Sequence, residues 1–184
     1  MLFRSVLGVD PGLTRCGLAV VDRSGSGKLQ MIDVGVIYTD KDAELATRLL
    51  ELDEQLAKWI SKYKPDVVAV ERVFSQLNVR TAMATGQAAG VALLLAAKSE
   101  LTVAMHTPSE VKAAVTGSGR ADKKQVATMV VKLLGLKETP KPVDSTDALA
   151  LAICHHWRGM GNARIAAAVK KESARVNKGK KVKK

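Results

Sequence analysis

The chain has 184 residues, 47% of them hydrophobic, and a net charge of +11 from 29 Lys and Arg against 18 Asp and Glu. This length and apolar content suit one globular domain with a sizeable core and exclude two full domains. The longest uncharged apolar run, residues 88–97, is about half of the roughly 20 residues that cross a bilayer, and no signal-peptide pattern opens the chain. We therefore expect a cytoplasmic protein with no membrane partner.

The positive charge is concentrated near the C-terminus. Residues 164–184 contain nine Lys or Arg and one acid, a net charge of +8, so the rest of the chain carries +3. A basic terminal block is typical of a solvated tail or of an electrostatic arm for a polyanion, and the overall charge favours a nucleic-acid partner. We predict a domain of residues 1–158 followed by a basic, partly disordered tail of residues 159–184.

Three strands open the chain. Residues 3–9 have the β-branched and aromatic bias of a strand, and a Pro-Gly pair ends it just after Asp10. Residues 17–21 return as a partner strand, and residues 29–38 add a third after a Ser-Gly turn, which predicts an antiparallel meander. Asp10 is thus expected at an edge of the sheet. Asp before Pro-Gly is also ordinary turn chemistry, so a purely structural role stays open.

Helices and strands alternate in the rest of the chain. Residues 42–63 place Leu and Ile at steps of three and four, the pattern of an amphipathic helix. Residues 66–70 read as a buried strand that carries Glu71 at its end, as the first strand carries Asp10. Further helices are expected at 78–98, 107–115 (with a capping box), 123–134 and 148–157, and a fifth strand at 101–106. This order predicts an α/β fold: a mixed five-stranded sheet, an antiparallel meander plus parallel strands, with helices on both faces.

Two more carboxylates, Asp144 and Asp147, are three residues apart at the start of the last predicted helix, so they share a helix face. Helix capping also explains Asp at such positions, one residue more easily than two. If this helix start lies beside Asp10 and Glu71, four carboxylates converge and need cations to neutralise them. A set of oxygen ligands selects Mg²⁺ or Mn²⁺, and two such ions about 3.5–4 Å apart activate water in phosphodiester hydrolysis.

Three segments in this order, GVDPGLTRCG, VAVERVF and DSTDALALA, resemble the acidic motifs of the RuvC family of Holliday-junction resolvases, which have a ribonuclease-H-like fold. The resemblance covers residues 3–157. It implies that Asp10, Glu71, Asp144 and Asp147 are catalytic and bind Mg²⁺, two ions per site, with Mn²⁺ able to substitute. It also implies symmetric cleavage of four-way DNA junctions in recombination and repair, with a junction-binding protein and a branch-migration motor, RuvA and RuvB, as partners.

Four residues are predicted to contact DNA. Phe74 follows Glu71 in an expected loop, where its ring can stack on an unpaired base; folding back into the core is the alternative. By the same resemblance, Lys112 and Lys123 hold the scissile phosphate or a neighbouring one, and Arg80 is a further candidate of this kind.

Small residues recur at steps of three and four in the helix of residues 78–98, at Ala82, Gly86, Ala89 and Gly90. This stripe predicts a close helix contact in a symmetric homodimer, because two cuts related by a two-fold axis need two copies of one site. The alternative is that the stripe packs the helix on its own sheet.

Three other functions stay open. Asp10-x-Gly12-x-Thr14 resembles the first phosphate loop of actin-like kinases, which close two domains around a nucleotide. Thermal stabilisation by a nucleotide would indicate a kinase of this class. A RuvC-like RNA-processing nuclease shares the first motif and would cleave structured RNA. A non-catalytic DNA-binding module would bind DNA without metal and leave it uncut.

Overall fold

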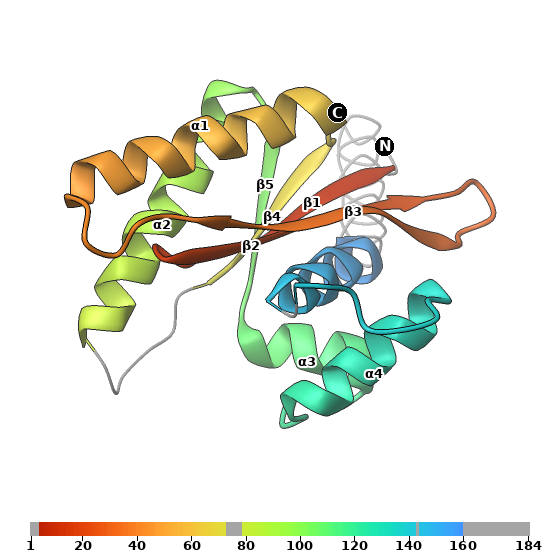
Figure 1. The fold of residues 1–184 in the computed structure, drawn as a ribbon. Coiled ribbons are helices and arrows are strands. Elements are labelled where there is room, and N and C mark those ends of the chain that lie inside the picture. The colour runs from red at the N-terminus through yellow and green to blue at the C-terminus, as the bar shows by residue number, and fades with distance from the viewer. Residues whose placement is uncertain (1–3, 73–78, 143, 160–184) are drawn as a thin grey trace, which may run out of the picture.

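The computed structural model describes residues 4–72, 79–142 and 144–159. Five strands form one sheet in the order β3-β2-β1-β4-β5 (Figure 1). Their bounds are β1 Ser5–Asp10, β2 Arg15–Arg23, β3 Leu29–Tyr38, β4 Val67–Glu71 and β5 Thr102–His106. β1, β2 and β3 pair antiparallel, whereas β4 pairs parallel with both β1 and β5. The predicted mixed sheet with an antiparallel meander is therefore confirmed.

Helices cover both faces of this sheet, as predicted (Figure 1). They are α1 Leu45–Tyr63, α2 Val79–Lys98, α3 Pro108–Thr116, α4 Lys123–Leu134, and an unlabelled helix of residues 145–159. α1 and α2 pack on one face, against alternate side chains such as Leu7, Val9 and Leu18. α3, α4 and the helix of residues 145–159 pack on the other, against Val6 and Ala19. The two-residue alternation of the strands thus supplies two separate cores.

The central strands explain why acids gather at one edge. β1 and β4 are buried on both faces and read as continuous apolar runs, as parallel strands between helix layers do. Val9 pairs with Val70 across these strands. The next residue of each strand, Asp10 and Glu71, therefore emerges at the same carboxyl edge of the sheet.

Two helices begin three residues away from the predicted start. The helix expected from residue 42 begins at Leu45, because Asp40 first closes a turn: its carboxylate accepts from Asp42 N at 3.0 Å and its carbonyl from Ala43 N at 3.3 Å. The last helix begins at Ser145, three residues early, where Ser145 Oγ donates to the Pro142 carbonyl at 2.6 Å. The capping box that opens α3 is present as predicted.

α2 is long and apolar enough to cross a membrane by length and composition alone, with a mean hydropathy of 1.2 over 18 residues. One side of it, including Ala88, Ala92 and Ala96, is buried beneath the sheet as a layer of the fold. The opposite side leaves Val79, Met83 and Leu94 exposed. α2 therefore has an apolar outer surface as well as an apolar inner one.

Two sequence predictions fall outside the described residues. One is Phe74, with the loop of residues 73–78 around it. The other is the basic tail, of which only Gly159 is described, as the last residue of the final helix.

Candidate metal and phosphate site

Asp10 and Glu71 form a carboxyl pair at the carboxyl edge of β1 and β4. Their side chains are hydrogen-bonded to each other. Burial, and then the charge of Asp10 and the hydrogen bond with it, raise the pKa of Glu71 to about 8. Burial also raises the pKa of Asp10, and the charges of Asp147 and Asp144 act in the same direction. At neutral pH the pair therefore holds one proton, which Glu71 donates to the Asp10 carboxylate.

Glycines bring the other two predicted acids to this edge. A Cβ on Gly8 of β1 would collide with the Ala148 carbonyl oxygen, and a Cβ on Gly17 of β2 would lie 2.6 Å from the Asp144 carbonyl oxygen. Glycine at both positions lets the start of the helix of residues 145–159 lie directly on the sheet. Asp144 and Asp147 stand at that start, and Gly17 pairs with Asp10 across β1 and β2.

Cationic side chains face both of these carboxylates. Lys123 Nζ donates to Asp147 Oδ2 at 3.0 Å, and Arg15 Nη1 lies 3.5 Å from Asp144 Oδ2. Lys123 is the first residue of α4, whose N-terminus is fixed by a capping box between Asp122 and Gln125. Its hydrogen bond with Asp147, and then the charge of Asp147, raise the pKa of Lys123, so it stays positively charged.

Five of the predicted site residues line one cavity of about 280 Å³. They are Asp10, Glu71, Lys112, Lys123 and Asp147. Side chains of α3, α4 and the last helix, such as Val111 and Val126, form its apolar wall. The cavity therefore places three carboxylates and two ammonium groups around a space that can admit a metal ion or a phosphate.

The remaining predicted residues lie elsewhere. Asp144 stands outside the residues that line this cavity, paired with Arg15, and Arg80 lines a different groove, on the side of Gly12 and Thr14. The structure thus brings five of the predicted residues together, with Asp144 on the neighbouring turn.

Within residues 4–72, 79–142 and 144–159, no group of three or more Asp, Glu, His or Cys side chains is arranged to hold a metal ion as it stands. Asp144 and Asp147 are instead turned to Arg15 and Lys123, and Glu71 holds a proton. The chemistry of the donors nevertheless fits a hard divalent cation. All of these donors are carboxylate oxygens. A metal cation can replace the proton of Glu71 and the ammonium group of Lys123 as the positive partner of these carboxylates.

Two residues beside this site were not predicted from the sequence. Arg15 is part of the first acidic motif. The sequence indicated it only through its position at the start of the strand that pairs with Asp10.

His106 pairs with Glu71 across β4 and β5, and its ring hydrogen-bonds to His155 at 3.1 Å. Burial lowers the pKa of both histidines, that of His155 to about 4, so both are neutral at pH 7. The sequence indicated His106 only through its position at the end of a predicted strand, as Glu71 is at the end of another.

Comparison with known proteins decides the family. The family model described as "Crossover junction endodeoxyribonuclease RuvC" matches residues 6–155. The chain belongs to the RuvC family. A RuvC relative from Frankia alni, which bears that description, is 58% identical over 163 residues, 89% of this chain and 83% of the relative.

Solved RuvC structures share this fold. The "Thermus thermophilus RuvC structure" is 35% identical with a TM-score of 0.79, covering 85% of this chain and 96% of that one. "T. thermophilus RuvC in complex with Holliday junction substrate" is 34% identical with a TM-score of 0.80, covering 86% and 96%. These similarities confirm the ribonuclease-H-like fold and the resemblance stated from the motifs.

Proposed function

We propose that this chain is a metal-dependent endonuclease that cleaves Holliday junctions by phosphodiester hydrolysis, in recombination and repair. The observation that carries the proposal is the single cavity that holds Asp10, Glu71 and Asp147 together with Lys112 and Lys123. Membership of the RuvC family, and the junction substrate bound by the Thermus thermophilus relative, support the choice of substrate.

In this proposal Asp10, Glu71, Asp144 and Asp147 are the catalytic acids and hold Mg²⁺, which Mn²⁺ can replace. Two such ions would supply the chemistry, activating a water and stabilising the leaving oxygen. Glu71 must release its proton before it can act as a ligand, because the pKa of its carboxyl group is about 8. Lys112 and Lys123 line the same cavity and would hold the phosphate by charge and hydrogen bonds.

The test is a comparison of substrates. The protein is incubated with an immobile synthetic four-way junction, a linear duplex of the same sequence and a structured RNA, each with Mg²⁺ and with a chelator. We expect cutting of the junction alone, and only with Mg²⁺. Preferential cutting of the RNA would indicate an RNA-processing nuclease, and metal-independent binding without any cutting would indicate a DNA-binding module.

We also propose that the working unit is a symmetric homodimer joined through the outer side of α2. Gly86 and Gly90 of the predicted stripe are exposed, with no atom within 4 Å of an added Cβ, whereas Ala89 is buried in the chain's own core. Ala89 thus packs on the chain's own sheet, whereas Gly86 and Gly90 leave room for a second copy of the helix. Exposed Met83 (61%) and Leu94 (55%) flank the two glycines and extend the apolar surface.

Gly90→Glu tests this interface, because a carboxylate at its centre would be desolvated without a partner on dimerisation. We expect a folded monomer by light scattering that no longer makes paired cuts in a junction. Lys98→Glu, at the end of the same helix, is the matched control and should remain a dimer. A Gly90→Glu protein that stays dimeric would place the interface elsewhere.

The remaining parts of the proposal rest on the family and on charge. The enzyme acts in a bacterial cytoplasm with a junction-binding protein and a branch-migration motor, RuvA and RuvB. Phe74 stacks on an unpaired base at the branch point, and Arg80 contacts a phosphate. The domain of residues 1–158 carries the nuclease, and the basic tail of residues 159–184 adds general electrostatic affinity for DNA.

A further inference from the structure

A second cavity, of about 660 Å³, lies beside the acidic site, and we call it the basic groove. It is formed by the turn between β1 and β2, the segment before α1 with the first turn of that helix, and the first turns of α2. Among the described residues that line it, none is acidic and four are cationic: Arg15, Lys41, Arg48 and Arg80. Arg15 is paired with Asp144, which lies outside the groove, at 3.5 Å, and no ion pair of the described residues includes Lys41, Arg48 or Arg80.

Arg48 is held in a fixed orientation in this groove. Its Nε donates to Thr39 Oγ1 at 2.9 Å and its Nη2 donates to Thr14 Oγ1 at 2.8 Å, while Thr39 in turn donates to the Leu13 carbonyl at 2.5 Å. Both of its partners are neutral hydroxyl groups, and no ion pair of the described residues includes Arg48. A guanidinium that is oriented in advance, with its charge not neutralised and N–H donors to spare, is well suited to a phosphate.

The basic groove lies next to the acidic site along the chain and through one ion pair. Gly12 and Thr14, which line it, follow Asp10 on the same turn, and Arg15 lies 3.5 Å from Asp144. A DNA strand whose scissile phosphate sits among the carboxylates must leave the site in some direction. The groove offers positive charge from α1 and α2, which cover the face of the sheet opposite to that of α3 and α4, the helices that carry Lys112 and Lys123.

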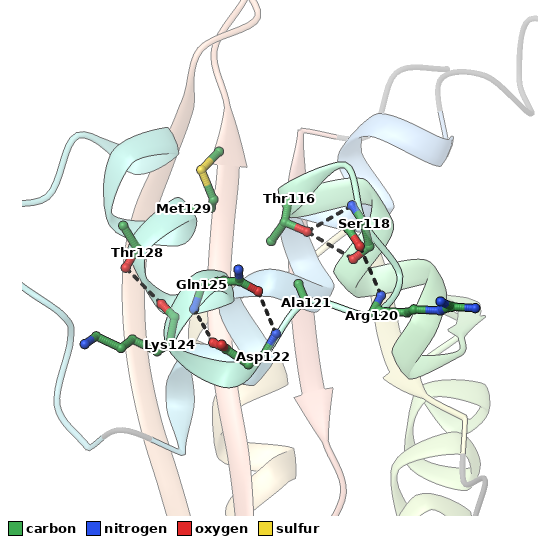
Figure 2. Close-up of a pocket in the computed structure, with 9 residues that line it drawn as sticks. All are labelled: Thr116, Ser118, Arg120, Ala121, Asp122, Lys124, Gln125, Thr128 and Met129. Carbon is green, nitrogen blue, oxygen red and sulfur yellow. Dashed lines mark hydrogen bonds between the residues drawn. The ribbon is translucent and has the colours of Figure 1, made fainter.

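Another basic surface lacks these properties. A cavity of about 640 Å³ between the end of α3 and the start of α4 is lined by Arg120 and Lys124, but also by Asp122 (Figure 2). Figure 2 shows Arg120 and Lys124 pointing in opposite directions, while Asp122 is hydrogen-bonded to Gln125 of its own capping box. Its cations do not converge on one space, so it carries no comparable inference.

We propose that the basic groove is a second phosphate-binding site, which holds the DNA backbone of the cleaved strand beyond the scissile phosphate. Arg48 is the oriented contact, and Lys41 and Arg80 are the peripheral ones. The inference rests on the proposed function for the identity of the strand, since the groove itself specifies only a polyanionic backbone.

Salt dependence of junction binding, measured with a chelator so that no DNA is cut, tests the groove. The plot of log affinity against log salt has a negative slope, and each lost phosphate contact should make that slope shallower by about 0.9. We expect this for Lys41→Gln and for Arg80→Gln. Lys98→Gln is the control: it removes the same charge at the far end of α2, about 27 Å from Arg80 at 1.5 Å per residue, and should keep the wild-type slope.

A scan with single neutral methylphosphonate groups along the cleaved strand locates the contact. We expect one position beside the scissile phosphate at which a methylphosphonate weakens DNA binding by the wild-type protein. At that position the same group should not weaken DNA binding by Arg80→Gln. Unchanged slopes for both groove variants, or an equal loss for Lys98→Gln, would overturn the proposal. The cleavage assay separates the two ideas: a wild-type protein that leaves junctions uncut refutes the proposed function, whereas reduced slopes still support the groove.

Discussion

Gly17→Ala tests whether close packing of the last helix on the sheet sets the geometry of the acids. The added Cβ would lie 2.6 Å from the Asp144 carbonyl oxygen, whereas ordinary contacts begin at 3.4 Å, so the start of the helix must retreat by about 0.8 Å. Overpacking of this kind costs about 1–3 kcal/mol of stability. A misplacement of about 1 Å between reacting groups can slow catalysis about 100-fold.

We therefore expect Gly17→Ala to fold with a lower midpoint in denaturant and to cut a synthetic junction roughly 10- to 100-fold more slowly, with junction affinity nearly unchanged. Gly25→Ala is the matched control, because a Cβ at Gly25, in the turn between β2 and β3, meets no atom within 4 Å. Equal cleavage rates for the two variants, at equal folded fractions, would refute the idea that this contact positions the acids.

Three further predictions concern charge. Because the folded pKa of Glu71 is raised to about 8 from an ordinary value of 4.5, the metal-free protein should lose stability as pH rises from about 5 to 8, and Glu71→Gln should remove that contribution in thermal melts. For the same reason, metal binding at pH 7 should release a proton from Glu71, seen as buffer-dependent heats in calorimetry; heats independent of the buffer would contradict it. Deleting residues 164–184 removes a charge of +8 and should make the salt dependence of DNA binding shallower, with the preference for junction over duplex retained; an unchanged dependence would show that the tail does not bind DNA.

The sequence was informative where local patterns decide structure. Buried apolar strands that each end in one carboxylate, β1 with Asp10 and β4 with Glu71, predicted both the sheet and the edge at which those acids lie. The capping box of α3 and the extent of α4 were equally local, and the structure has both as predicted.

What the sequence could not supply depends on contacts between distant segments. Nothing local indicates that Arg48 of α1 reaches Thr14 across 34 positions, or that Arg15 faces Asp144. Pairing with cations also explains why Asp144 and Asp147 do not complete a four-carboxylate cluster, since charge neutralisation can come from the chain's own side chains. Of the proposed contacts of the basic groove, Arg80 was therefore predicted from the sequence, whereas Arg48 and Lys41 were found only in the structure.

We propose that the carboxyl pair of Asp10 and Glu71 at the sheet edge serves cleavage and not folding. The most direct measurement compares Asp10→Asn with the wild type on one end-labelled immobile junction in Mg²⁺, recording binding and strand cutting in the same samples. We expect the wild type to make paired cuts in two strands of like polarity, and Asp10→Asn to bind the junction equally or more tightly without cutting it. Cutting by Asp10→Asn at the wild-type rate would contradict it.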